Sequence, residues 1–269
     1  MNNNITVLGP GITTLDFSPS GEEKILAFQE VFPHCLEKIS VIPDYWFSAD
    51  PSAYLGGLSF LLNNQNVKEL KKIKILVPSV FTKDFDHYRK YCGTTPLMRI
   101  NYGWSIFHSL LLESSKLYET EIIPVTTSKF IKISGEENFN EVFSNCGKER
   151  FNSEKVIFGT VEFDSESVIG DRYKWGLENK LTSTVLPMCH HLGATVVKIF
   201  GFDYQGPRFY SDIERHPWND ETQEGNSVVD FSLSLLKKWK SWEHAHGMEI
   251  VSGTNNKISL INNILEFKK

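Results

Sequence analysis

The chain has few cysteines and none of the motifs that depend on paired cysteines. Its 269 residues include four, Cys35, Cys92, Cys146 and Cys189, and these are far apart. No Cys-x-x-Cys pair is present, so the sequence predicts no zinc site, and no metal ligand is assigned. We expect a reducing, cytoplasmic setting.

Long apolar runs and an excess of positive charge are also missing. No apolar run reaches the roughly 18 residues that a membrane-spanning helix needs. The first residues, Met-Asn-Asn-Asn, have neither the basic nor the apolar region of a signal peptide. The formal net charge is −5 and the pI is near 5.9. This balance argues against a general nucleic-acid binder, which would carry a basic stripe.

What the chain does contain is typical of one globular α/β domain. Hydrophobic residues make up 41% and charged residues 23% of the sequence. Runs rich in β-branched apolar residues alternate with helical patterns, which predicts a doubly wound, Rossmann-like, mainly parallel sheet with helices on both faces. Strands are expected at 5–8, 24–28, 45–48, 73–77, 121–125, 195–200 and 248–251. We predict a single nucleotide-binding domain over 1–269, with a polar lid at 205–228.

Two helices and one edge or hairpin strand can be predicted in more detail. A helix over 182–193 has Thr182 or Ser183 as its N-cap and Gly193 in the left-handed position at its end. A second helix over 104–118 is expected to bury Ile106, Leu110, Leu111 and Leu117. The alternation of apolar and polar positions over 156–163 predicts an edge or hairpin strand.

Polar groups are predicted to converge beyond the strand at 195–200. Ligands of open α/β sheets bind beyond the carboxyl ends of the strands. The start of the 182–193 helix and the residues Asp203, Tyr204 and Tyr210 should therefore share one crevice. Free N–H groups and hydroxyls at a helix start suit a phosphate. Two tyrosines six residues apart on a loop can donate hydrogen bonds to the same anion.

Two further strand ends carry candidate ligand-binding residues. The first strand runs into Gly9-Pro10-Gly11, followed by Thr13. This loop is neither a full Gly-x-Gly-x-x-Gly nor a Walker loop, so a tight turn at an edge explains it about as well as phosphate binding. Asp50 follows the third strand and suits a ribose hydroxyl better than a phosphate.

Two segments resemble the bacterial sialyltransferases of glycosyltransferase family 42. Lys-Leu-Thr-Ser-Thr-Val, from Lys180, followed by Met-Cys, resembles that family's Arg-Ile-Thr-Ser-Gly-Val segment. Gly-Phe-Asp-Tyr-Gln, from Gly201, resembles its Gly-Ile-Asp-Phe-Tyr-Gln, with Tyr210 as the second tyrosine. The chain departs from the family at Pro10 and Asp50, where the family has Asn, and at Lys180, where it has Arg.

The resemblance implies metal-independent sugar transfer from a CMP-activated donor, such as CMP-sialic acid, to a glycan acceptor. Tyr204 and Tyr210 would assist departure of the nucleotide phosphate, and His216 in the predicted lid is our candidate base. The implied substrate-binding residues are Gly9, Gly11, Thr13, Gln29, Asp50, Lys180, Thr182, Ser183 and Asp203. No cofactor and no nucleic-acid partner is expected, and a homo-oligomer is left open.

Two other functions remain open. The hydroxymethylpterin diphosphokinase-like family shares the fold, and pyrophosphoryl transfer would need Mg²⁺ on carboxylates such as Asp50 and Asp203. The other is a nucleotide-sugar-binding protein without catalysis. Metal dependence separates the first from sugar transfer, and CMP binding without turnover would indicate the second.

Overall fold

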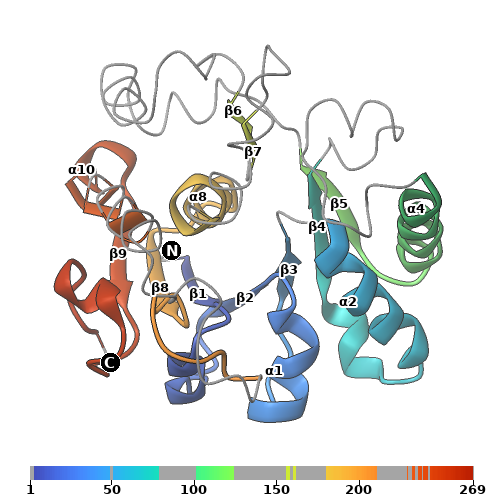
Figure 1. Ribbon diagram of the computed structural model, residues 1–269, viewed down its shortest axis with the longest axis horizontal. Helices are drawn as coiled ribbons and strands as arrows, with labels where there is room; N and C mark the ends of the chain where they lie inside the picture. Colours follow the sequence, from blue (N-terminus) through green and yellow to red (C-terminus); the bar gives the residue numbers. More distant parts are fainter. Residues whose placement is uncertain are drawn as a thin grey trace.

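A computed structural model describes residues 3–48, 51–78, 101–123, 156–157, 160–161, 180–210 and, with short gaps, 229–268. Seven strands form one open, all-parallel sheet in the order β5-β4-β3-β2-β1-β8-β9 (Figure 1). They are β1 (Asn4–Leu8), β2 (Lys24–Phe28), β3 (Tyr45–Phe47), β4 (Lys74–Pro78), β5 (Thr120–Ile123), β8 (Val196–Phe200) and β9 (Glu249–Ser252). The predicted α/β class and its parallel sheet are confirmed.

The strand order places a switch point between β1 and β8. From β1 the chain adds β2, β3, β4 and β5 on one side, and β8 and β9 on the other. All seven strands point the same way, so their carboxyl ends meet at one edge of the sheet. In open sheets of this kind, ligands bind outside that edge at the switch point. The loops that follow β1, β2 and β8 are therefore the place to look for a site.

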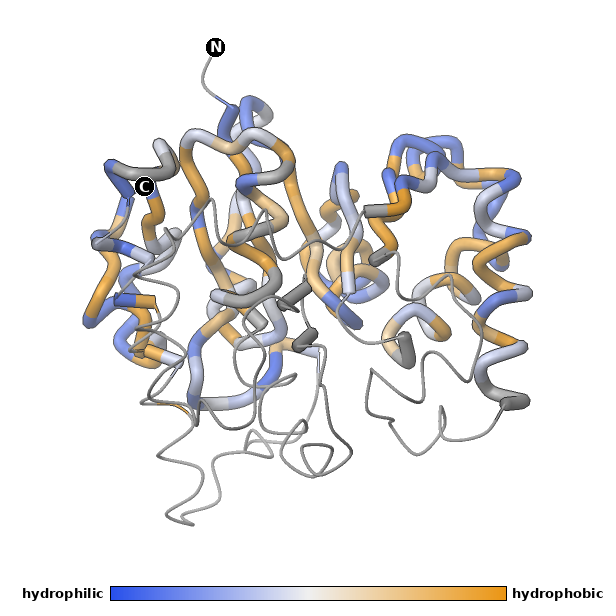
Figure 2. Tube along the Cα trace, turned by 90° about the horizontal axis from the view of Figure 1, so that it is seen from above, coloured by the Kyte–Doolittle hydropathy of each residue, from blue (hydrophilic) through white to orange (hydrophobic). Residues whose placement is uncertain are grey.

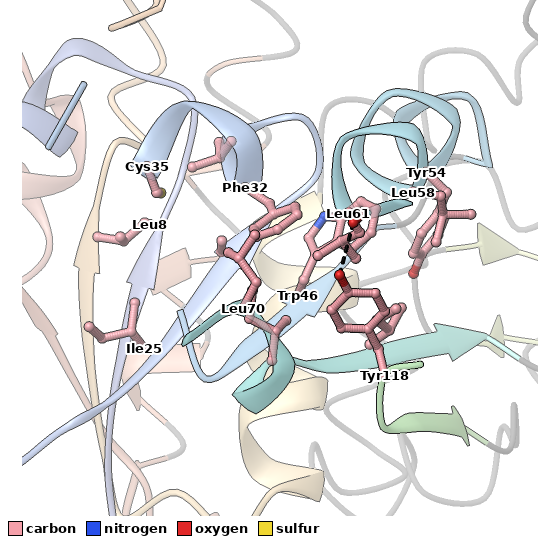
Figure 3. Packing of buried hydrophobic residues seen from close by; sticks show 14 of the residues in the cluster. Leu8, Ile25, Phe32, Cys35, Trp46, Tyr54, Leu58, Leu61, Leu70 and Tyr118 are labelled. Atoms are coloured by element: carbon pink, nitrogen blue, oxygen red, sulfur yellow. Dashed lines mark hydrogen bonds between the residues drawn. The ribbon is translucent and has the colours of Figure 1, made fainter. Parts of the chain in front are cut away.

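Helices cover one face of the sheet that we call the α1 face. They are α1 (Val31–Ile39), α2 (Pro51–Asn63) and α4 (Asn101–Ser115). Alternate strand residues point to this face, as the two-residue period of a strand requires: Leu8, Ala27, Trp46, Val77 and Phe200. Trp46 packs between Phe32 and Tyr54, with ring centroids 4.9 and 5.0 Å away (Figure 3). Burying one such side chain contributes about 1.5–3 kcal/mol.

The opposite face, which we call the α8 face, has its own core. It is covered by a π-helical turn (Lys180–Val185), by α8 (Leu186–His191), by helical residues between 229 and 241, and by α10 (Glu243–His246) (Figure 1). Its buried residues include Val7, Phe28, Ile199, Met188 and Trp239. Hydrophobic residues follow the strands and the sides of the helices beside them (Figure 2). With both faces covered, the strands read as nearly continuous apolar runs.

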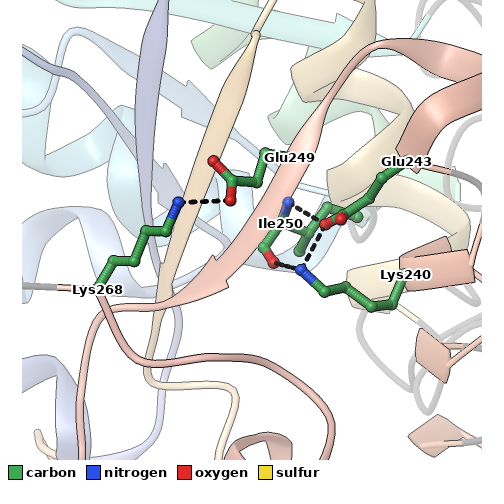
Figure 4. Close-up of polar contacts among 5 residues, drawn as sticks. All are labelled: Lys240, Glu243, Glu249, Ile250 and Lys268. Atoms are coloured by element: carbon green, nitrogen blue, oxygen red, sulfur yellow. Dashed lines mark hydrogen bonds and ion pairs between the residues drawn. The ribbon is translucent and has the colours of Figure 1, made fainter.

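The outer edge of β9 is satisfied by the backbone of the C-terminal segment at Ser252, through a bridge to Phe267, and by side chains at Ile250. Glu243 of α10 accepts a hydrogen bond from the Ile250 N–H (2.6 Å), and the Lys240 ammonium donates to the Ile250 carbonyl (3.1 Å) (Figure 4). Lys240 and Glu243 also form an ion pair at 2.9 Å. An unpaired edge invites association with another chain, and charged side chains on it discourage that.

Short elements complete the described residues. They are the 3₁₀ turns at Ile12–Asp16, Lys68–Lys72 and Leu260–Asn263, and the antiparallel pair β6 (Val156–Ile157) and β7 (Thr160–Val161). The pair lies within 156–163, where an edge or hairpin strand was predicted. Within the described residues, no helix is long and apolar enough to cross a bilayer.

Two helix predictions need correction. The 182–193 helix has no cap at Thr182 or Ser183, because the π-helical turn already begins at Lys180. Pro187 follows in the first turn of α8, where the missing backbone N–H is tolerated. Gly193 has the predicted left-handed backbone, with φ of 76°.

The second correction concerns α4. Ile106 and Leu117, predicted to be inside, are 38% and 41% exposed. Leu111 is buried as predicted and Leu110 is partly buried, and Trp104 and Phe107 join Leu111 at helical spacing on the buried side. Leu117 lies beyond the end of the helix, so the helical period no longer places it.

Candidate functional site

Two glycine-containing loops are bonded to each other at the switch point. The Gly9 N–H donates to the Phe200 carbonyl (2.8 Å), and the Gly11 N–H donates to the Gly201 carbonyl (2.7 Å). A Cβ on Gly9 would lie 2.6 Å from the Gly201 carbonyl oxygen, so only glycine lets the two backbones approach this closely. These N–H groups therefore join the ends of β1 and β8 and are not free for a phosphate.

Thr13 and Asp203 complete what we call the glycine clamp: Gly9, Gly11, Thr13, Gly201 and Asp203. The Thr13 N–H donates to Asp203 Oδ2 (3.0 Å), its hydroxyl donates to Oδ1 (2.5 Å), and the Gly201 N–H donates to that hydroxyl (2.9 Å). Asp203 is only 2% exposed. Burial raises the pKa of its carboxyl, and the bonds from Thr13 oppose that shift. Both carboxylate oxygens are occupied, so the clamp holds the edge of the sheet together.

Direct substrate contact by Gly9, Gly11, Thr13 and Asp203 stays a prediction, and in the structure their polar groups bond within the protein. Thr13 is fully buried, and its polar groups bond to the clamp itself. The two glycines are buried as well. The sequence pattern was informative about position, because these residues do lie at the switch point. What it could not reveal is that the loops pack against each other.

Gln29, which follows β2, has an unusual backbone. Its φ is 58°, in the left-handed region that residues other than glycine seldom adopt. Two bonds impose this conformation: the Gln29 N–H donates to the Phe47 carbonyl, and the Trp46 indole N–H donates to the Gln29 carbonyl, both at 2.8 Å. Strain of this kind is concentrated at functional sites. The side-chain amide has no hydrogen bond within the described part of the chain.

The loop after β8 passes over the end of β1 and reaches α1, where its last residues contact polar side chains. The Phe209 N–H donates to the Pro10 carbonyl (3.0 Å), which places the end of the loop over the first glycine turn. There Arg208 Nη1 donates to Glu30 Oε1 and to the Tyr210 hydroxyl, each at 3.2 Å. The Tyr210 ring stacks on His34 of α1, with centroids 4.3 Å apart and planes 8° apart. We call Glu30, His34, Arg208 and Tyr210 the Arg208 cluster.

Tyr210 is held as a neutral hydrogen-bond donor. Burial raises the pKa of its hydroxyl, the Glu30 carboxylate raises it further, and Arg208 opposes both. A guanidinium has no acceptor, so in the bond between them the Tyr210 oxygen must accept. Its own proton is then left to donate, and no described residue accepts it.

Tyr204, the other predicted catalytic tyrosine, lies on the opposite face of the sheet. It packs against the core of the α8 face, whereas Tyr210 packs against the core of the α1 face. Its φ is 60°, and burial raises the pKa of its hydroxyl, with the Ser232 hydroxyl acting in the other direction. The two rings pack on different faces because the loop between them crosses the end of the sheet, and a shared phosphate contact stays a prediction.

The remaining predicted site residues are only partly described. Thr182 is buried inside the π-helical turn. Lys180 and Ser183 belong to the same turn, but their side chains lie outside the description. His216 and Asp50 also lie outside the described residues, as does most of the predicted lid.

Sequence reasoning missed Glu30, His34 and Arg208. Arg208 had a weak signal, because it is the one charged residue in the stretch between the two tyrosines. Glu30 directly follows Gln29 at a strand end, which is a position of the kind that carries ligand-binding residues. His34 had no signal, since a histidine in a helix is ordinary.

No protein-family model matches the chain, and neither does any curated protein. Among solved structures, it is similar to the sialyltransferase CstII from Campylobacter jejuni in complex with the substrate analogue CMP-3FNeuAc. That match has 11% identity and a TM-score of 0.46, over 99% of this chain and 86% of the other. The same values hold for CST-II in complex with a trisaccharide acceptor and CMP. At this distance the likeness assigns no activity to the chain.

Proposed function

We propose that the chain is a glycosyltransferase that uses a nucleotide-activated sugar, a CMP-sugar in the simplest case, and needs no metal ion. One observation carries the proposal: Tyr210 lies at the carboxyl edge of the sheet, beside the switch point, as a partly buried neutral donor whose proton no described residue accepts. A donor fixed in this way can stabilise the charge that develops on a leaving phosphate. The resemblance of the Lys180–Tyr210 segment to sialyltransferases supports the same chemistry.

The other residues take supporting roles in this proposal. The glycine clamp holds the ends of β1 and β8 together, and Gln29 lies at the end of the neighbouring β2. Tyr204 positions the loop from the α8 face. His216 remains our candidate for the base that deprotonates the acceptor hydroxyl, as a histidine can do near neutral pH.

Magnesium-dependent pyrophosphoryl transfer is the less favoured alternative. It would need Asp203 to offer its carboxylate to Mg²⁺. Both oxygens of that carboxylate accept hydrogen bonds from Thr13, and the group is buried. A cation would have to displace those bonds, so we rank this function second.

The test is the release of CMP from CMP-sialic acid in the presence of EDTA, which needs no knowledge of the acceptor. Tyr210→Phe keeps the ring and removes the hydroxyl, and should lower kcat by roughly 10²–10³ while the affinity for CMP changes little. Tyr118→Phe is the matched control. It removes a buried hydroxyl, which donates to the Leu61 carbonyl (2.8 Å). Tyr118 lies next to the start of β5, at the other edge of the sheet.

The outcomes separate the three functions. Unchanged turnover in Tyr210→Phe would reject the proposed role of this residue. Wild-type activity that disappears with EDTA would favour the magnesium-dependent alternative. CMP binding without any turnover would indicate a nucleotide-sugar-binding protein.

A further inference from the structure

Two acceptors share one nitrogen of the Arg208 guanidinium. Nη1 has two N–H groups, and it donates to Glu30 Oε1 and to the Tyr210 hydroxyl, each at 3.2 Å. The carboxylate oxygen and the hydroxyl oxygen therefore lie no farther apart than two hydrogen-bond lengths. The guanidinium stands between a charged acceptor and a hydroxyl, and it occupies both.

Glu30 is a competitor for the proton of Tyr210. An ionised carboxylate only accepts hydrogen bonds, and it forms short, strong ones with hydroxyl groups. Burial and the Glu30 charge raise the pKa of Tyr210, whereas Arg208 lowers it, so the carboxylate already acts on this hydroxyl. The Glu30 side chain is 40% exposed and has room to turn towards the ring once the guanidinium is gone. A Tyr210 proton bonded to Glu30 would not be available to a phosphate.

The surroundings hold the ring and the guanidinium in this arrangement. The Tyr210 ring stacks on His34 at 4.3 Å and meets Phe209 edge-on at 5.1 Å, which fixes the direction of its hydroxyl. The Gly11–Arg208 bridge holds the backbone of Arg208 over the end of β1. Arg208 Nε is buried without a hydrogen-bond partner among the described residues. An orientation that leaves one donor unsatisfied calls for an explanation, and the two bonds of Nη1 supply it.

We propose that Arg208 is a positioning residue, which keeps the Tyr210 proton away from Glu30 and leaves it free to donate to the ligand. The inference rests on the proposed function in taking the phosphate of a CMP-sugar as the group that receives this proton. Arg208 does not contact that phosphate and acts only through Tyr210. Its loss should therefore slow the transfer step, in which the hydroxyl stabilises developing charge, and leave the affinity for CMP unchanged.

Release of CMP from CMP-sialic acid in EDTA, measured on a set of single and double variants, tests this role. Arg208→Met keeps the length of the side chain without a donor, so kcat should fall by about 10²-fold, the scale for losing one transition-state donor. Arg208→Lys can still donate to both oxygens and should keep most of the rate. Adding Glu30→Gln to Arg208→Met replaces the competing carboxylate by a weaker acceptor and should restore most of the rate.

Two controls separate positioning from a general effect of charge. In a Tyr210→Phe background, Arg208→Met should have no further effect, because residues that act through one group are not additive. Lys38→Met removes an exposed cation from the last turn of α1 and should turn over like the wild type. If Arg208→Met does not fold, Arg208→Gln replaces it, because its side chain is too short to bond both oxygens.

A measurement without turnover reports on the hydrogen bond itself. The Raman doublet of tyrosine depends on whether the phenol hydroxyl donates or accepts, and subtracting the spectrum of Tyr210→Phe isolates the signal of Tyr210. Arg208→Met should shift this doublet towards a strong donor, and the added Glu30→Gln should reverse the shift. Calorimetric titration with CMP should give the same Kd for wild type and Arg208→Met.

The outcomes distinguish this inference from the proposed function. An unchanged doublet, or a further loss of rate from Arg208→Met in the Tyr210→Phe background, overturns the positioning role and leaves the function standing. Weaker CMP binding at unchanged kcat would mean that Arg208 holds the ligand, which also overturns the positioning role. If the doublet shifts as expected but the wild type releases no CMP, the positioning of Tyr210 stands and the CMP-sugar function fails.

Discussion

The glycine clamp and the Arg208 cluster lie side by side at the same edge of the sheet, yet their polar groups are in opposite conditions. In the clamp the side-chain polar groups are satisfied within the fold: Thr13 bonds both carboxylate oxygens of Asp203, and both residues are buried. In the cluster, Arg208 is partly exposed, its Nε has no partner among the residues that the structure describes, and Tyr210 has a proton to donate.

The contrast separates residues that build the edge from residues that act there. A satisfied and buried network stabilises the fold and has nothing left to offer a ligand. An oriented but incomplete network costs stability and is retained where a ligand completes it. Changes in the clamp should therefore alter unfolding, and changes in the cluster should alter binding and turnover.

The largest effect is expected at Gly201. Its φ is 71°, and a Cβ would meet the Gly9 carbonyl oxygen at 2.5 Å as well as the Thr14 hydroxyl. Gly201→Ala combines left-handed strain with overpacking and should lower the free energy of unfolding by about 3–5 kcal/mol. Gly247→Ala is the control, because its φ is 68° but nothing lies near the added carbon. It should cost only about 1–2 kcal/mol in urea unfolding. Equal losses would mean that the clamp is not tightly packed.

Thr13→Val tests whether the clamp is purely structural. It keeps the shape of the side chain but removes the hydroxyl that bonds Asp203 and Gly201. We expect a loss of about 2–3 kcal/mol in unfolding free energy, since two buried groups lose their partner. The Kd for CMP, measured on folded protein, should stay within about 2-fold of wild type. A clear loss of CMP affinity at unchanged stability would give Thr13 the direct contact first predicted for it.

Asp203 gives the clamp a pH dependence. Its pKa is raised in the fold from the ordinary value of 3.8. The folded state then holds a proton that the unfolded state releases. The contribution of Asp203 to the free energy of unfolding therefore falls as pH rises from about 4 through the raised pKa. Asp203→Asn cannot titrate, and its stability should improve relative to wild type over that window. Urea unfolding of both proteins at pH 4, 5, 6 and 7 measures the difference, and a difference that is constant with pH would contradict it.

The smallest stability effect is expected in the Arg208 cluster. Arg208→Lys disturbs a partly exposed ion pair, which contributes about 0–1 kcal/mol to folding. Its Tm should therefore stay within about 2–4 °C of wild type. A loss as large as that of Thr13→Val would mean that Arg208 belongs to the structural network, and would remove the contrast between the two regions.

Much of the fold follows from local patterns. The seven strands were predictable because β-branched apolar runs fit a sheet that is buried on both faces. Gly193 was predictable because only glycine adopts a left-handed helix end at little cost. In α4 the prediction was right for Leu111 and wrong for Ile106: apolar residues lie on more than one side of this helix, and the neighbouring α2 decides which of them are buried.

The candidate site was predictable in place but not in its partners. Strand ends pointed to Gly11, Thr13, Gln29 and Asp203, since parallel strands bring their carboxyl ends together. The sequence by itself thus determined the strands, the glycine turns and the edge at which they meet. Only the tertiary structure brings Thr13 into contact with Asp203, 190 residues away, and Glu30 into contact with Arg208, 178 residues away. It also places Tyr204 and Tyr210 on different faces of the sheet. The physical reason is that local patterns encode burial and turn geometry, whereas contacts across such distances follow from strand order, which places β1 between β2 and β8.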